Sequence, residues 1–138
     1  MSFVLDTSVA LAWCFEDKQT TAIMALLDRV TETGAVAPQL WPIEALNGLL
    51  VAERRGRIAA PLRARLAGFL QALPIAIDDA TAEQVWQATA PLAERHRLTA
   101  YDATYLELAL RLALPLATTD AALVVAAREA GVEVVLAG

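Results

Sequence analysis

Several residue types that build cross-linked or reactive sites are almost missing from this chain of 138 residues. The single cysteine, Cys14, excludes a disulfide framework and a cysteine-rich zinc site. The single histidine, His96, lies in a run of charged residues typical of a surface, so an acid–base pair of two histidines is excluded. The same shortage argues against a nucleophile at Cys14 or Ser8, because either would depend on that one histidine.

Long apolar runs and a targeting segment are also missing. No stretch of about 18 apolar residues occurs, which excludes a membrane-spanning helix. The first six residues have neither a basic start nor a long apolar run, so we expect no signal peptide and a cytoplasmic protein. Hydrophobic residues make up 57% of the chain, which excludes disorder and leaves an apolar surplus for partners. The length suits a single domain over residues 1–138.

The order of short apolar segments and helical segments predicts an α/β fold. Strands are expected at residues 2–5, 35–37, 74–77, 116–118 and 132–136, with helices between them. Short apolar strands that alternate with helices are typical of a parallel sheet covered on both faces.

Four carboxylates are expected at one edge of this sheet. Asp6 ends the first predicted strand, and Asp120 follows the fourth, so both face the edge where the carboxyl ends of parallel strands meet. Asp102 and Glu44 lie in the first turns of predicted helices. If these helices start at the same edge, the four acids converge from distant parts of the sequence.

Such an acidic cluster indicates a divalent cation. Carboxylates in one cleft repel one another, and oxygen-only ligands suit Mg²⁺ or Mn²⁺ together with a substrate phosphate. The net charge is −5; without these four acids, twelve acidic residues remain against eleven basic ones. The acidity of the chain is therefore compatible with an anionic substrate.

Three of the four acids also have a purely structural interpretation. Asp6 and Asp120 precede helices that they could cap, and Asp102 could complete a first helical turn opened by Thr99. Glu44 borders a mostly apolar helix face, where an unpaired carboxylate is unfavourable, so a metal or an arginine partner is expected.

Four sequence blocks resemble the signature blocks of PIN-domain ribonucleases, and most of all the VapC toxins of bacterial type II toxin–antitoxin systems. The blocks are VLDTSV at residues 4–9, LWPIEALN at 40–47, LTAYDA at 98–103 and ATTD at 117–120. They cover essentially the whole chain in order and spacing. The resemblance implies an α/β/α sandwich around a parallel sheet of about five strands.

The resemblance also implies an activity, a cofactor and partners. It implies a Mg²⁺-dependent endoribonuclease that forms a homodimer and is inhibited by a small VapB-type antitoxin. By matching position, the acidic, metal-binding site consists of Asp6, Glu44, Asp102 and Asp120. Thr7, Ser8 and Thr118 match the polar positions that support the site, and Asn47 matches an amide beside it. Asn47 could equally be an ordinary polar residue at the edge of a buried helix face.

Other interpretations stay open. The chain could be a non-catalytic acidic module that binds a cation or a partner, or a PIN nuclease with a housekeeping role in RNA processing. Two arginine groups, at residues 54–65 and 95–97, could contact phosphates or simply be solvated helix ends. Trp13 and Phe15, with Ile23 in the next helix, could form a groove for an antitoxin helix, although Trp13, Trp41 and Trp86 could equally be core residues.

Overall fold

A parallel four-stranded sheet organises the computed structural model, which describes residues 2–135. The strand order is β3-β2-β1-β4. The strands are β1 (Val4–Leu5), β2 (Ala35–Pro38), β3 (Ile75–Asp78) and β4 (Leu116–Ala117). Val4 is paired with Val36 on one side and with Leu116 on the other, so the ends of β1 and β4 are level with each other.

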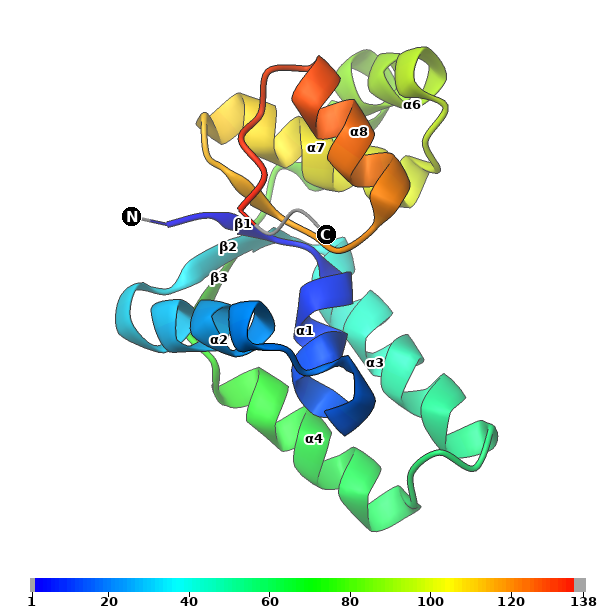
Figure 1. Cartoon of the computed structure of the whole chain (residues 1–138). Coiled ribbons are helices and arrows are strands. Elements are labelled where there is room, and N and C mark those ends of the chain that lie inside the picture. Colours follow the sequence, from blue (N-terminus) through cyan, green and yellow to red (C-terminus); the bar gives the residue numbers. More distant parts are fainter. Residues whose placement is uncertain (1, 136–138) are drawn as a thin grey trace.

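Helical segments make up most of the rest of the described chain. They are α1 (Thr7–Cys14), η1 (Glu16–Lys18), α2 (Thr21–Thr33), α3 (Leu40–Arg54), α4 (Ala60–Ala72), α5 (Thr81–Gln84), η2 (Val85–Thr89), α6 (Ala90–His96), α7 (Ala100–Leu112) and α8 (Ala121–Glu129). Figure 1 shows α1 to α4 on one side of the sheet and α6 to α8 on the other. The predicted α/β/α sandwich is therefore confirmed. None of the helices within residues 2–135 is long and apolar enough to cross a bilayer.

The central strands are apolar because helices cover both of their faces. Phe3, Val4 and Leu5 have no solvent-exposed surface, and the same holds for Leu116 and Ala117. Such strands are continuous apolar runs rather than alternating ones. The first polar side chains therefore appear where β1 and β4 end, at the edge where the site lies.

The expected fifth strand is reduced to a single bridge. Val134 pairs with Leu116 in parallel as an isolated bridge, and the amide of Val135 donates to the carbonyl of Leu116. The expected strand ended at residue 136, which lies outside the described residues. Within residues 2–135 the sheet thus has four strands rather than about five.

The helical segment between β3 and α7 contains a wider turn. Residues Val85–Thr89 form the π-helical segment η2, which ends just before Pro91 in α6. Proline has no N–H to donate, and its ring crowds the carbonyl four residues earlier, so a regular α-helix cannot pass through it.

The three tryptophans do not share one role. Trp13 and Trp41 are buried in the core, as the core interpretation expects. Trp86 in η2 is 82% exposed, so that interpretation is wrong for it.

Candidate functional site

Asp6 is a buried carboxylate held by two hydroxyls. It follows β1 directly and is 5% exposed. Its Oδ2 accepts hydrogen bonds from Ser8 Oγ at 2.6 Å and from Thr118 Oγ1 at 2.8 Å. Although Asp6 precedes α1, its side chain makes no capping bond, so capping does not explain this residue. Burial raises the pKa of Asp6, while the Ser8 and Thr118 hydroxyls oppose that rise.

The same two hydroxyls tie the end of β4 to the start of α1. Thr118 Oγ1 accepts from the amide of Asp120 at 3.1 Å, and Ser8 Oγ accepts from the amide of Thr119 at 3.0 Å. Each hydroxyl therefore donates to Asp6 and accepts from the loop after β4. The predicted supporting roles of Ser8 and Thr118 agree with these contacts.

Glu44 is anchored by hydroxyls rather than by an arginine. Its Oε1 lies 2.6 Å from Tyr105 OH and 3.1 Å from Thr7 Oγ1, and both hydroxyls are placed to donate to it. Thr7 Oγ1 and Tyr105 OH are themselves 2.7 Å apart. Of the two partners expected for Glu44, a metal or an arginine, the arginine is wrong: within residues 2–135 the groups that contact its Oε1 at hydrogen-bond distance are these two hydroxyls. Sequence reasoning missed Tyr105, although its place one turn after Asp102 on the same helix was a usable signal.

Asp102 is electrostatically coupled to the other three acids. It lies half-buried in the first turn of α7, where its amide donates to the capping hydroxyl of Thr99 at 3.1 Å. The pKa of Asp102 is raised to about 6, first by burial and then by the negative charges of Asp120, Asp6 and Glu44. Asp102 therefore lies near enough to each of the other three predicted acids for their charges to interact.

Asp120 is a helix cap as well as a member of this group. It is the N-cap of α8, and its Oδ1 accepts from the amide of Leu123 at 2.9 Å. The structural interpretation of Asp120 is thus correct for one carboxyl oxygen. Its charge also raises the pKa of Asp102, so the capping bond does not separate Asp120 from the other acids, and its role as a metal ligand stays a prediction.

Asn47 makes no hydrogen bond to Glu44. It is exposed on α3, and among residues 2–135 its side chain makes no hydrogen bond. The contacts in this structure agree with an ordinary polar residue, and a role beside the site stays a prediction.

The donor set fits a hard divalent ion in its chemistry but is not a preformed cage. All four candidate ligands are carboxylates, the ligand type that Mg²⁺ prefers. In the part of the chain that the structure describes, no three His, Cys, Asp or Glu side chains are grouped so that they could hold a metal ion as they stand. Asp6, Glu44 and Asp120 each direct an oxygen at a neighbouring hydroxyl or amide instead.

Groups that could support other chemistry are occupied or unreactive. His96 was expected at the surface, but its side chain is 6% exposed and its Nδ1 lies 3.1 Å from Glu129 Oε2. Burial raises the pKa of Cys14 to about 11, which keeps it a neutral thiol. Asp78, at the end of β3, is paired with Arg111 at 2.8 Å. None of these three side chains competes with the acidic group as a reactive centre.

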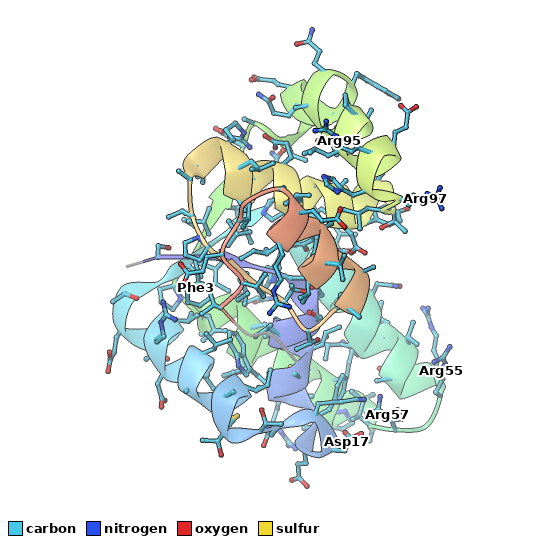
Figure 2. The ribbon with its side chains drawn as sticks, turned by 45° about the horizontal axis from the view of Figure 1, so that its top comes forward. Phe3, Asp17, Arg55, Arg57, Arg95 and Arg97 are labelled. Atoms are coloured by element: carbon cyan, nitrogen blue, oxygen red, sulfur yellow. The ribbon has the colours of Figure 1, made fainter. Side chains whose placement is uncertain are left out.

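The two arginine groups lie apart from each other on the surface (Figure 2). Arg95 and Arg97 belong to the end of α6, and Arg55 and Arg57 follow α3. Arg57 forms an exposed ion pair with Asp17 at 3.2 Å. Its guanidinium also lies 4.7 Å from the ring centre of Phe15. Phosphate binding by either group stays a prediction.

Comparison with known proteins decides the family. The PIN domain model matches residues 3–129, which is nearly the whole chain. The chain belongs to the PIN-domain family. PIN domains are typically nucleases, and PIN nucleases generally use divalent metal ions. Among curated proteins, no sequence matches this PIN domain.

Solved structures share the fold of this PIN domain. PAE2754 from Pyrobaculum aerophilum superposes with a TM-score of 0.70 at 23% identity, over 98% of this chain and 90% of that one. VapBC2 from Rickettsia felis, bound to a DNA fragment from its promoter, gives 0.67 at 12% identity over 100% and 99%. FitAcB from Neisseria gonorrhoeae gives 0.58 at 21% identity over 97% and 96%. At these identities the similarity establishes the fold.

Proposed function

We propose that this PIN domain is a Mg²⁺-dependent endoribonuclease of the cytoplasm, the toxin of a VapBC-type toxin–antitoxin module. The observation that carries the proposal is the network of contacts at the carboxyl edge of the sheet: Ser8 and Thr118 join Asp6 to the start of α8 at Asp120, and Thr7, next to Asp6, contacts Glu44. The raised pKa of Asp102 agrees with its place beside these three acids. In a PIN domain, such a group is suited to metal-assisted hydrolysis of a phosphodiester. Mn²⁺ is expected to substitute for Mg²⁺ because it prefers the same oxygen ligands.

In this mechanism Asp6, Asp102 and Asp120 would hold the metal, and Glu44 would either bind a second ion or orient the attacking water. The chemistry supplied by a divalent ion bound there would be polarisation of the scissile phosphate and a lower pKa of a water molecule. Ser8 and Thr118 keep the Asp6 carboxylate in place through their hydrogen bonds. Attack in line with the leaving 3′-oxygen gives 5′-phosphate and 3′-hydroxyl ends.

A groove beside the site supports the antitoxin part of the proposal. It has a volume of about 500 Å³ and lies against α1 and α2, with apolar walls that include Leu11, Phe15 and Ile23. Ser8 and Thr119 line it as well, so it reaches the residues that support Asp6. An amphipathic helix of a VapB-type antitoxin in this groove would end at the acidic site. The antitoxin proposal draws further support from VapBC2, a structure of the same fold that is named as a VapB–VapC pair.

A homodimer is also proposed, because apolar side chains remain exposed on α3. Ile43 is 69% exposed and Leu46 is 47% exposed. Sedimentation of the purified chain gives twice the monomer mass if the proposal holds, and Ile43→Glu/Leu46→Glu returns it to the monomer mass.

RNA cleavage by the purified protein tests the central proposal. Cleavage of a structured RNA is expected with Mg²⁺, none with EDTA, and a loss of at least about a hundredfold in Asp6→Asn. Asp28→Asn, which removes an exposed acid from α2, is the matched control and should cleave normally. Cleavage that survives both EDTA and Asp6→Asn contradicts the mechanism, and an inactive wild type supports a non-catalytic acidic module.

A further inference from the structure

Three oxygen atoms from three helices meet beside the acidic site. Thr7 belongs to α1, Glu44 to α3 and Tyr105 to α7. Their oxygens are separated by 2.6 Å, 2.7 Å and 3.1 Å, with the shortest distance between Tyr105 OH and Glu44 Oε1. The cluster therefore links helices on both faces of the sheet at the carboxylate of Glu44.

The number of protons determines how this cluster is bonded. Each hydroxyl carries one proton, so two protons serve three close contacts. In the arrangement that uses the two shortest distances, Thr7 donates to Tyr105 and Tyr105 donates to Glu44. A hydroxyl that accepts one hydrogen bond donates a stronger one, so Thr7 strengthens the bond from Tyr105 to the carboxylate.

Burial fixes the position of the donor. Tyr105 has no exposed surface, and Thr7 is also buried. A buried phenol needs a hydrogen-bond partner, and a close-packed ring cannot turn to find another one. All the hydrogen bonds that Glu44 accepts within residues 2–135 go to Oε1, so its Oε2 is the oxygen left for other contacts.

We propose that Tyr105 is a positioning residue of this site: backed by Thr7, its phenol holds Oε1 of Glu44 and so presents Oε2 to the reacting groups. The inference rests on the proposed nuclease function and gives Glu44 a defined orientation in it. Tyr105 itself touches neither the substrate nor the reacting atoms.

Tyr105→Phe removes the phenol oxygen and keeps the ring. With a short RNA substrate, kcat is expected to fall about tenfold, the factor that a hydrogen bond to a charged acceptor is worth, while KM stays within about twofold. Thr104→Val is the matched control, because it removes a neighbouring buried hydroxyl that bonds the carbonyl of Ala100 at 2.7 Å and no acid. An unchanged kcat in Tyr105→Phe, or an equal fall in Thr104→Val, overturns the positioning role.

A double-mutant cycle gives a readout that does not need activity. Unfolding by urea is measured for the wild type, Tyr105→Phe, Glu44→Gln and the double variant. Tyr105→Phe should lower the urea concentration at the unfolding midpoint. This decrease should be at least twofold smaller when Glu44→Gln is already present, because the partner of Tyr105 is then already altered. Equal decreases of the midpoint in both backgrounds overturn the positioning role of Tyr105. A wild type that cleaves no RNA but shows this coupling rejects the nuclease proposal alone.

Discussion

At the scale of single residues, Thr118 connects the acidic site to the sheet. Its side chain is wholly buried, donates to Asp6 and accepts from the amide of Asp120. Thr118→Val keeps the shape and removes both bonds, so the partly buried amide of Asp120 and the buried carboxylate of Asp6 each lose a partner. We expect the free energy of unfolding in urea to fall by about 1–3 kcal/mol and RNA cleavage to fall about tenfold.

Thr119→Val is the control for this prediction, because Thr119 is exposed and contributes only its backbone amide to the network. It should change neither stability nor cleavage. Equal behaviour of the two valine variants would show that the Thr118 hydroxyl does not support the site.

The residues that sequence reasoning found and those it missed differ in a physical way. Asp6 and Asp120 could be placed because the end of a parallel strand has a known position in the fold. Tyr105 could not, because its role depends on the distance from α7 to Glu44 across the molecule. The same holds for His96, whose contact with Glu129 depends on α8 approaching the end of α6.

At the scale of elements, Arg111 joins α7 to the end of β3. It contacts Glu107 on its own helix at 2.8 Å and Asp78 at 2.8 Å. Glu107 is 4% exposed, so its charge depends on this partner. The hydrogen bonds from Arg111 also lower the pKa of Asp78.

Arg111→Met is therefore expected to destabilise the fold by about 3 kcal/mol in urea unfolding, since it leaves a buried carboxylate unpaired. Adding Glu107→Gln should restore part of that loss, because the unpaired charge is then gone. A double variant no more stable than Arg111→Met would show that the charge of Glu107 is not the cause.

Most elements could be predicted because their hydrophobic periodicity and their Gly and Pro boundaries agree. The exceptions have tertiary causes. The segment after α8, where a fifth strand was expected, forms only one bridge to the sheet, between Val134 and Leu116. Whether such a segment becomes a strand depends on this tertiary pairing. The widened turn η2 lies within one run of helix-forming residues, and only Pro91 marks it.

At the scale of the whole molecule, burial of Asp102 and, after it, charge repulsion at the site should make stability depend on pH. The pKa of Asp102 is raised from 3.8 to about 6, so the folded protein binds this proton more tightly than the unfolded chain does. The resulting stabilisation is complete below pH 3.8 and is lost as the pH rises through about 6. Relative to Asp102→Asn, the free energy of unfolding of the wild type should therefore decline across that window. A constant difference between the two proteins would contradict this assignment.

The same repulsion predicts how Mg²⁺ acts on the whole fold. At pH 7 the carboxyl of Asp102 is mostly ionised, and a cation that binds the folded site would offset its repulsion from Asp6, Glu44 and Asp120. A hundredfold excess of Mg²⁺ over its Kd should stabilise the folded state by about 2.7 kcal/mol, measured as a melting temperature several degrees higher that EDTA reverses. Asp102→Asn should lose most of this increase, whereas Asp28→Asn should keep it. An equal increase in both variants would mean that Mg²⁺ binds elsewhere on this acidic chain.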